Sequence, residues 1–334
     1  FSHRNSLQNV SNLLHPRQQG PIPTRGGSRT LNQLPLPAIN HPSPIDGQTA
    51  LLAVIGDPIQ HSLSPLMHNA ALAQLGLNWR YLALPVPPER LGEAVQGLGA
   101  IGCRGVSVTI PHKESIAALL DSVDPIAKQL GAVNCLVPDG RGGWHGTNTD
   151  WSGFLVPLQQ RFSNGAETAL VLGGGGVVRA VLHSCQALGF KRLLLRARNK
   201  QKMEALAAWA ATLALSLELL PWEEPLTDLL PQVDLVVNGT PLGMGEWQQQ
   251  SPLSEGQLAL LPAHALVYDV VYTPRPTRLL REAAARGLAC QDGLEMLVQQ
   301  GAAALKLWTG LGQVPVDAMG KAVEQALAKP RLVP

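Results

Sequence analysis

Four consecutive glycines, Gly173, Gly174, Gly175 and Gly176, directly follow a short apolar run at 169–172 and directly precede a predicted helix at 177–188. A strand that passes through a glycine turn into a helix presents backbone N–H groups to a pyrophosphate. The third glycine of the pattern G-x-G-x-x-G falls at Val178, so the match is partial. An ordinary tight turn is the alternative, and the strand–turn–helix setting favours a dinucleotide site.

Basic residues follow the next predicted strand, at 192–195. Arg196, Arg198, Asn199 and Lys202 occur there with no acid before Glu204. An NAD enzyme places an acid about 20 residues past the glycines for the ribose 2′-hydroxyl, whereas an arginine there suits a 2′-phosphate. Guanidinium and ammonium groups bind a dianionic phosphate well. A solvated basic face is the alternative, and the distance from the glycine turn favours NADP.

Short apolar runs alternate with helical segments along most of the chain. Strands are predicted at 51–55, 79–84, 105–110, 168–172, 192–195, 233–238 and 265–271. Helices are predicted from Ser64 as N-cap to Gly76, at 88–97, from about Pro111, and at 177–188, 202–213 and 296–308. This alternation indicates parallel βαβ units and an α/β fold. A length of 334 residues suggests two such domains.

Composition excludes several classes of protein. Lys plus Arg exceed Asp plus Glu by only 2, which argues against a nucleic-acid or polybasic membrane protein. No apolar run approaches the ~18 residues that span a bilayer. The four cysteines lie far apart without a C-x-x-C pair, unlike a disulfide scaffold or zinc ribbon. We expect a soluble protein of a reducing compartment.

Residues 1–48 differ from the rest of the chain. They are rich in Pro, Gly, Gln, Ser and Asn, and they hold several arginines but a single acid, Asp46. Such a segment buries too little apolar surface to offset its chain entropy, so a disordered extension is predicted. Its acid-poor, Arg- and Ser-bearing composition also resembles an organelle transit peptide, although a clear amphipathic helix is lacking.

Polar motifs stand near the ends of the first predicted strands, where α/β enzymes keep their sites. Taken one at a time, the polar residues of each motif can be explained as helix caps, turn formers or solvated residues, without a catalytic role. The motifs are HSLSP at 61–65, SVTIPHK at 107–113, GAVN at 131–134 and NTD at 148–150.

Together with GGGGVVRA, RARNKQK, NGTPLGM, YDVVY and DGLEMLVQQ, these motifs make the chain from about residue 50 onward resemble the shikimate dehydrogenase family. These NADP-dependent enzymes reduce 3-dehydroshikimate to shikimate. The resemblance implies an N-terminal α/β substrate-binding domain at 50–149, completed by C-terminal helices at 293–330. It further implies a Rossmann-like NADP-binding domain at 150–292, with the cleft between the two domains.

The resemblance also implies roles for individual residues. Lys113 and Asp150 match the catalytic pair, and Asp150 also holds a substrate hydroxyl. Substrate-binding residues are Ser62, Ser64 and Tyr272 for the carboxylate and Thr109, Asn134 and Gln300 for the ring hydroxyls. Cofactor-binding residues are Gly173, Gly174, Gly175, Gly176, Val177, Arg196, Arg198, Asn199, Lys202, Val270 and Gly293. No metal is expected, because no third ligand accompanies His61 and His112.

Some residues depart from the family's pattern. Ser107 stands where Asn is usual, Cys135 where Thr is usual, Asn199 where Thr is common and Lys202 where Arg is common. These differences bear on cofactor affinity and selectivity and not on the reaction class.

Other readings stay open. One rival is a quinate/shikimate dehydrogenase with broader substrate or NAD use, and another is a non-catalytic NADP-binding sensor. A methylene-tetrahydrofolate dehydrogenase is a further alternative, but the carboxylate-binding serines Ser62 and Ser64 would have no function in such an enzyme. We expect a small-molecule substrate, no nucleic-acid or membrane partner and a cytoplasmic location. A homodimer and organelle targeting stay open.

Overall fold

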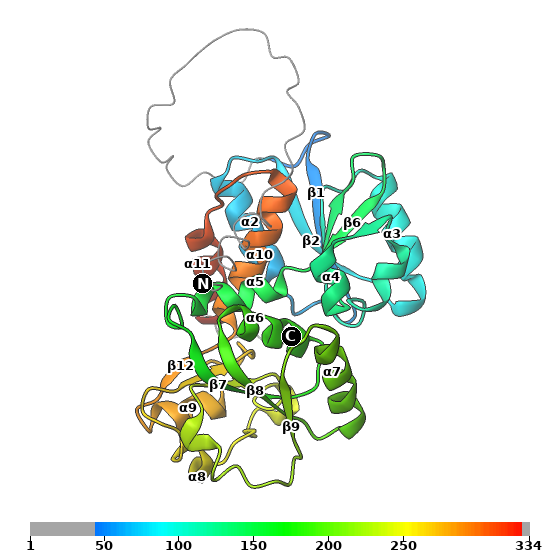
Figure 1. Ribbon diagram of the computed structural model, residues 1–334. Helices are drawn as coiled ribbons and strands as arrows, with labels where there is room; N and C mark the ends of the chain where they lie inside the picture. Colours follow the sequence, from blue (N-terminus) through cyan, green and yellow to red (C-terminus); the bar gives the residue numbers. More distant parts are fainter. Residues whose placement is uncertain (1–43, 329–334) are drawn as a thin grey trace.

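The computed structural model describes residues 44–328, so the extension predicted for residues 1–48 lies almost wholly outside the described residues. Two sheets, each covered by helices, make up this part of the chain (Figure 1). The chain leaves the first sheet through helix α5 and returns to it with α10 and α11, which lie beside α2 in the upper part of Figure 1. The expected α/β architecture is confirmed.

The first sheet has the strand order β2-β1-β3-β5-β6-β4. Strands β1, β2 and β3 are mutually parallel, and β5 runs antiparallel to both β3 and β6. The strands are β1 (Ala50–Gly56), β2 (Trp79–Pro85), β3 (Val106–Val108), β4 (Ser122–Val123), β5 (Cys135–Pro138) and β6 (Trp144–Thr147). The helices are α2 (Ser64–Gln74), η1 (Pro88–Arg90), α3 (Leu91–Ala100), η2 (Ser115–Leu119) and α4 (Pro125–Leu130).

Two predictions for this half are wrong. No helix begins at Pro111: the chain turns there, with the backbone N–H of His112 donating to the carbonyl of Thr109 (2.9 Å), and the 3₁₀ helix η2 starts only at Ser115. The residue that precedes a proline disfavours helical backbone angles. The chain therefore turns after β3 instead of entering a helix at Pro111. Ser64 is the first helical residue of α2 and caps nothing with its side chain, because Leu63 takes the cap position.

The second sheet is wholly parallel, with the order β12-β11-β10-β7-β8-β9. Numbered within this half, that is the Rossmann order 6-5-4-1-2-3, and its switch point lies between β7 and β10. The strands are β7 (Ala166–Leu172), β8 (Phe190–Arg196), β9 (Leu217–Leu220), β10 (Leu235–Asn238), β11 (Leu266–Asp269) and β12 (Ala289–Gln291). The expected Rossmann-like fold is confirmed.

The helices after β6 cover both faces of this sheet and connect the two halves, except that the last two, α10 and α11, return to the core of the first half. They are α5 (Asp150–Leu155), η3 (Val156–Leu158), α6 (Val177–Ala187), α7 (Lys200–Thr212), η4 (Leu230–Gln232), η5 (Gly245–Trp247), α8 (Glu255–Leu258), α9 (Arg278–Ala284), α10 (Leu294–Thr309) and α11 (Val316–Ala328). Along β7, Val171 packs into the core on one face and Leu170 into the core on the other. Burial on both faces explains why the inner parts of these strands, such as 169–172 and 235–237, are continuously apolar in sequence.

Helix α10 joins the two halves at a close helix–helix contact with α5. A Cβ atom on Gly153 would lie 2.7 Å from Cβ of Gln300 and 2.8 Å from the carbonyl oxygen of Met296. Further along α10, Leu305 and Trp308 are buried in the core of the first sheet with Met67. The C-terminal helices therefore complete the first half of the molecule.

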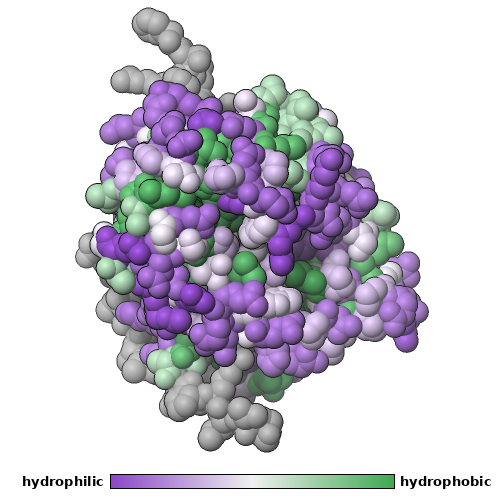
Figure 2. All heavy atoms as spheres, turned by 90° about the horizontal axis from the view of Figure 1, so that it is seen from below, coloured by the Kyte–Doolittle hydropathy of each residue, from purple (hydrophilic) through white to green (hydrophobic). Residues whose placement is uncertain are grey.

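The outer surface is polar over the second half. Figure 2 shows the face seen from below, where hydrophilic side chains predominate and hydrophobic ones lie in small separate groups. Within residues 44–328, no helix combines the length and the apolarity that crossing a membrane requires.

Candidate active site

Lys113 and Asp150 form an ion pair. Lys113 lies in the turn after β3, and Asp150 is the first residue of α5. The Lys113 Nζ donates to Oδ2 of Asp150 at 2.6 Å, and the two side chains are 27% and 12% exposed. The structure thus brings together the two residues predicted as the catalytic pair. Their partial exposure leaves the ammonium group within reach of a small molecule.

Two asparagines fix Asp150: Asn134 binds its carboxylate, and Asn148 binds its backbone N–H. Asn134 Nδ2 donates to Oδ1 of Asp150 (2.8 Å) and to Oγ1 of Thr149 (3.0 Å), while its Oδ1 accepts from the Thr149 N–H (2.7 Å). Asn148 accepts from the Asp150 N–H (2.9 Å) and donates to the carbonyl of Ala132 (2.9 Å). Each oxygen of Asp150 therefore has one donor, and the carboxylate can hold Lys113 in a single direction.

The antiparallel ladder of β3, β5 and β6 sets this geometry. The carbonyl of Lys113 accepts from the N–H of Val133 at 2.7 Å. Asn134 is bonded through its own carbonyl to Val108 (2.8 Å) and through its N–H to Thr147 (3.0 Å). The strands β5 and β6 were not predicted from the sequence. Asn134 directly precedes β5 and Asp150 follows β6, so the pairing of these strands places both residues near Lys113.

Thr109 and the two serines lie at the carboxyl end of β1 and β3. The N–H of Thr109 donates to the carbonyl of Ile55 (3.0 Å), and Gly56 permits the approach because a Cβ there would lie 2.5 Å from the Thr109 methyl group. The Ser64 N–H donates to Oγ of Ser62 at 3.3 Å at the start of α2. Ser64 is buried and Ser62 half-buried.

Tyr272 and Gln300 reach this region from outside the first sheet. Tyr272 follows β11 of the second sheet, but its ring packs against the core of the first sheet. Gln300 lies on α10 beside Gly153 of α5, the helix that Asp150 begins, and its Nε2 donates to the carbonyl of Leu297 (2.7 Å). The predicted substrate residues therefore come from both halves of the chain.

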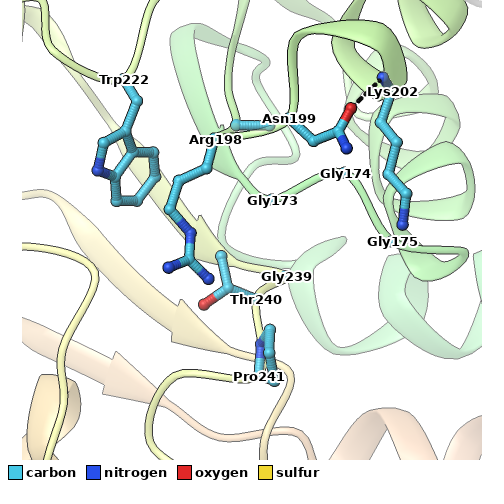
Figure 3. Close-up of a pocket in the computed structure, with 11 residues that line it drawn as sticks. Gly173, Gly174, Gly175, Arg198, Asn199, Lys202, Trp222, Gly239, Thr240 and Pro241 are labelled. Carbon is cyan, nitrogen blue, oxygen red and sulfur yellow. Dashed lines mark hydrogen bonds between the residues drawn. The ribbon is translucent and has the colours of Figure 1, made fainter. Parts of the chain in front are cut away.

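A second pocket opens at the switch point of the parallel sheet (Figure 3). Gly173 has φ +121°, and a Cβ there would lie 2.7 Å from the carbonyl oxygen of Gly239. Figure 3 shows Arg198 directed toward Thr240, and Lys202 extended alongside Gly175. The pocket is lined by Gly173, Gly174, Gly175, Ala197, Arg198, Asn199, Lys202, Trp222, Gly239, Thr240 and Pro241.

This pocket fits an anionic dinucleotide. Its floor has no room for side chains at Gly173, and two cations line it. Most of the predicted cofactor residues thus meet in one place. Asn199 also caps α7, because its Oδ1 accepts from the Lys202 N–H at 2.9 Å, the dashed contact of Figure 3. Gly176 and Val177 follow at the start of α6.

Arg196 is placed differently from Arg198. It is buried, and its Nη2 donates to the carbonyl oxygens of Trp222 and Glu224, the latter at 2.9 Å. Burial lowers the pKa of Arg196, against the opposing effect of the neighbouring Glu223 and Glu224. Its guanidinium group supports the loop after β9 and does not line the pocket.

Val270 and Gly293 meet each other, and neither lines this pocket. A Cβ on Gly293 would collide with the carbonyl of Val270, so only glycine allows this backbone approach. The contact joins the end of β11 to the start of α10.

Sequence reasoning missed five residues that line the pocket, namely Ala197, Trp222, Gly239, Thr240 and Pro241. Thr240 and Pro241 belong to NGTPLGM, a motif that was noted without a role. Nothing local marks Trp222, which reaches the pocket from a loop distant in sequence.

Comparison with known proteins gives the family. A model described as the shikimate dehydrogenase substrate binding domain matches residues 54–136, and one described as the shikimate 5′-dehydrogenase C-terminal domain matches residues 293–324. A shikimate dehydrogenase (NADP(+)) of Synechocystis is 47% identical over 288 residues, covering 85% of this chain and 98% of the relative.

Solved structures agree. Shikimate 5-dehydrogenase of Thermus thermophilus, in complex with NADP(H) and shikimate, has a TM-score of 0.73 at 38% identity, covering 83% of this chain and 100% of that one. Quinate dehydrogenase of Corynebacterium glutamicum, in complex with NAD, has a TM-score of 0.76 at 29% identity, covering 83% and 99%. The paired Lys113 and Asp150, the Rossmann order and these similarities agree, and the chain belongs to the shikimate dehydrogenase family.

Proposed function

We propose that this chain is an NADP-dependent shikimate dehydrogenase, which catalyses the reversible reduction of 3-dehydroshikimate to shikimate in the pathway to chorismate and the aromatic amino acids. The observation that carries the proposal is the Lys113–Asp150 pair, joined at 2.6 Å and partly exposed. A cation held by a fixed carboxylate is what a carbonyl reduction needs beside the reacting oxygen.

The mechanism assigns the proton to Lys113. When bound, NADPH supplies the hydride that reduces the C3 carbonyl of 3-dehydroshikimate. The Lys113 ammonium group stabilises the negative charge that develops on the oxygen and donates a proton to it. Asp150 holds Lys113 in place and accepts a hydrogen bond from a substrate hydroxyl. In the oxidative direction, neutral Lys113 accepts the hydroxyl proton.

The remaining polar residues orient the substrate. Ser62, Ser64 and Tyr272 are the proposed partners of the substrate carboxylate. Thr109, Asn134 and Gln300 are the proposed partners of its ring hydroxyls, and the amide of Asn134 also holds Asp150 (2.8 Å). Holding the ring in a fixed position lowers the entropic part of the barrier.

NADP binding is assigned to the pocket of the second sheet. The N–H groups of the glycine turn before α6 would hold the pyrophosphate, and Arg198 and Lys202 would supply the positive charge for the 2′-phosphate. Val177, Val270 and Gly293 stay proposed cofactor contacts. Arg196 acts in this proposal through the loop of Trp222, because its guanidinium group is already engaged there.

A spectrophotometric assay at 340 nm tests the proposal by crossing shikimate and quinate with NADP and NAD. Turnover of shikimate with NADP is the expected result. Comparable rates with quinate or NAD would assign the chain to a quinate/shikimate dehydrogenase. Absence of turnover in a folded protein that still binds NADP would favour a non-catalytic sensor.

We infer a division into a substrate-binding domain at 50–149 with the helices at 293–330, and an NADP-binding domain at 150–292. The core contacts of α10 with the first sheet support this division. A cytoplasmic location fits the free thiols of Cys103, Cys135 and Cys185, which are all buried. The homodimer stays a prediction, which sedimentation or gel filtration tests.

A further inference from the structure

Asp269 is a buried carboxylate that the proposed mechanism does not use. It is the last residue of β11 and is 0% exposed. Its Oδ1 accepts from Asn238 Nδ2 and from the Val271 N–H, both at 3.0 Å, and its Oδ2 accepts from Thr277 Oγ1 at 2.7 Å. Three segments of the chain therefore meet at one side chain.

The first of these segments forms a wall of the cofactor pocket. Asn238 lies opposite Asp269 in the register of β10 and β11. Its Oδ1 accepts from the Thr240 N–H (3.0 Å) and from Thr240 Oγ1 (2.7 Å), and its Nδ2 also donates to the carbonyl of Leu242 (3.0 Å). Thr240 Oγ1 in turn accepts from the Leu242 N–H at 3.1 Å. The side chain of Asn238 thus shapes the loop that contains the pocket residues Gly239, Thr240 and Pro241.

The second segment leads to the substrate side. The Val271 N–H bonded to Asp269 lies between Val270, whose carbonyl faces Gly293, and Tyr272, the proposed partner of the substrate carboxylate. Asp269 therefore anchors the backbone on which Tyr272 is carried. The same carboxylate is therefore hydrogen-bonded to Asn238, which shapes the wall of the cofactor pocket, and to the backbone beside Tyr272.

A carboxylate at this position lowers stability at neutral pH. Burial raises the pKa of Asp269 to about 6, because hydrogen bonds from Thr277, Val271 and Asn238 only partly offset the lost solvation. The nearby Asp292, itself paired with Arg275, raises it further, and Tyr268 on the same strand is also close enough to interact. Packing alone gives no reason for a charged group here.

We propose that Asp269 is a positioning residue that holds the 238–242 loop and the Val271–Tyr272 backbone in the arrangement that binds NADP and shikimate. This inference rests on the proposed function for its ligands. Removing the carboxylate leaves Asn238 without the acceptor that orients it, and the pocket wall then loses its fixed shape.

The test compares Asp269→Ala and Asp269→Asn with the wild type. Titration calorimetry measures the Kd of NADP⁺ without turnover, and amide hydrogen exchange of the ligand-free protein reports on Thr240, Leu242 and Val271. We expect Asp269→Ala to raise the Kd about tenfold or more and to speed exchange at these three amides. Asp269→Asn keeps the Oδ1 acceptor, so it restores most of the binding and protection.

Leu258→Ala is the matched control, because Leu258 is buried in the same half of the molecule and its apolar side chain has no hydrogen-bonding group to offer this network. It should lower the melting temperature and leave the Kd of NADP⁺ unchanged. An equal rise in Kd in this control, at equal loss of stability, would overturn the proposal. So would wild-type Kd and exchange in Asp269→Ala.

Should Asp269→Ala fail to fold, Asp269→Leu takes its place, because leucine is close to aspartate in size and has no acceptor for Asn238 Nδ2 or the Val271 N–H. The same rise in Kd with faster exchange at Thr240, Leu242 and Val271 is then expected, and wild-type values of both would overturn the inference. A wild-type protein that binds NADP⁺ but turns over no substrate would refute the proposed function and leave the inference about Asp269 standing. The binding and exchange measurements do not depend on turnover.

Discussion

Replacing Lys113 by alanine is expected to lower kcat by at least ~100-fold. The change removes the ammonium group 2.6 Å from Oδ2 of Asp150. Asn134 and Asn148 still hold the carboxylate and the backbone of Asp150, so the rest of the site keeps its shape. A positioned acid–base group contributes ~10²–10⁴-fold, and the lower figure corresponds to about 2.7 kcal/mol of activation free energy.

The loss should be confined to turnover. The Lys113–Asp150 pair is partly exposed, so its removal should cost about 1 kcal/mol or less in the free energy of unfolding. Arg198 and Lys202 lie in the other pocket, so the KM for NADPH should change little. The assay follows NADPH oxidation at 340 nm with saturating 3-dehydroshikimate, and thermal unfolding controls for stability.

Lys113→Arg separates charge from proton transfer. A guanidinium group keeps its proton under all working conditions, so it supplies positive charge without acting as an acid. We expect this variant to stay well below the wild type. A kcat within about threefold of the wild type in a folded Lys113→Ala protein would refute the role of Lys113.

Three further predictions follow from other parts of the structure. Arg198→Ala should raise the KM for NADP about tenfold more than the KM for NAD, and equal effects on both cofactors would contradict its role at the 2′-phosphate. Gly153→Ala should lower the free energy of unfolding by about 1–3 kcal/mol in denaturant titrations, because its methyl group would lie 2.7 Å from Cβ of Gln300; unchanged stability would show that the helices separate freely. Asp269 has its pKa raised from 3.8 to about 6, so the folded protein binds more protons than the unfolded chain between these values, and stability falls as pH rises through them. Between pH 4 and pH 7 the wild type should lose up to roughly 3 kcal/mol more stability than Asp269→Asn, and parallel pH profiles would contradict this ionisation.

The second sheet was largely predictable because its signals are local. Strand segments buried on both faces are continuously apolar, as 169–172 in β7 and 235–237 in β10 are, and the glycine turn needs only its immediate neighbours to be recognised. The start of α6 follows from the same short window, whereas the edge strands β9 and β12 and the helices α8 and α9 were not predicted. The cluster of Arg198 and Lys202 was found for the same reason, because it directly follows a strand.

The first sheet was less predictable because its short strands depend on partners. β5 has four residues and begins at Cys135, and β6 has four and follows a Gly-rich turn, so neither has the length that marks a strand in sequence. The direction in which the side chain of Arg196 points could not be predicted from the sequence either. Its partners, the carbonyls of Trp222 and Glu224, come from a loop 26 and 28 residues away.

The proposed catalytic pair, Lys113 and Asp150, is assembled where the two halves of the molecule join. Lys113 belongs to the first sheet, whereas Asp150 begins α5, the helix by which the chain leaves that sheet. Helix α5 is held against α10 at Gly153 and Gln300, and α10 is anchored in the core of the first sheet. A movement of the second sheet that does not shift α5 against α10 would therefore leave Asp150 beside Lys113. Trp151, Phe154 and Leu155 of α5 are also buried in the core of the second sheet, so this helix ties the proposed acid–base pair to both halves of the molecule.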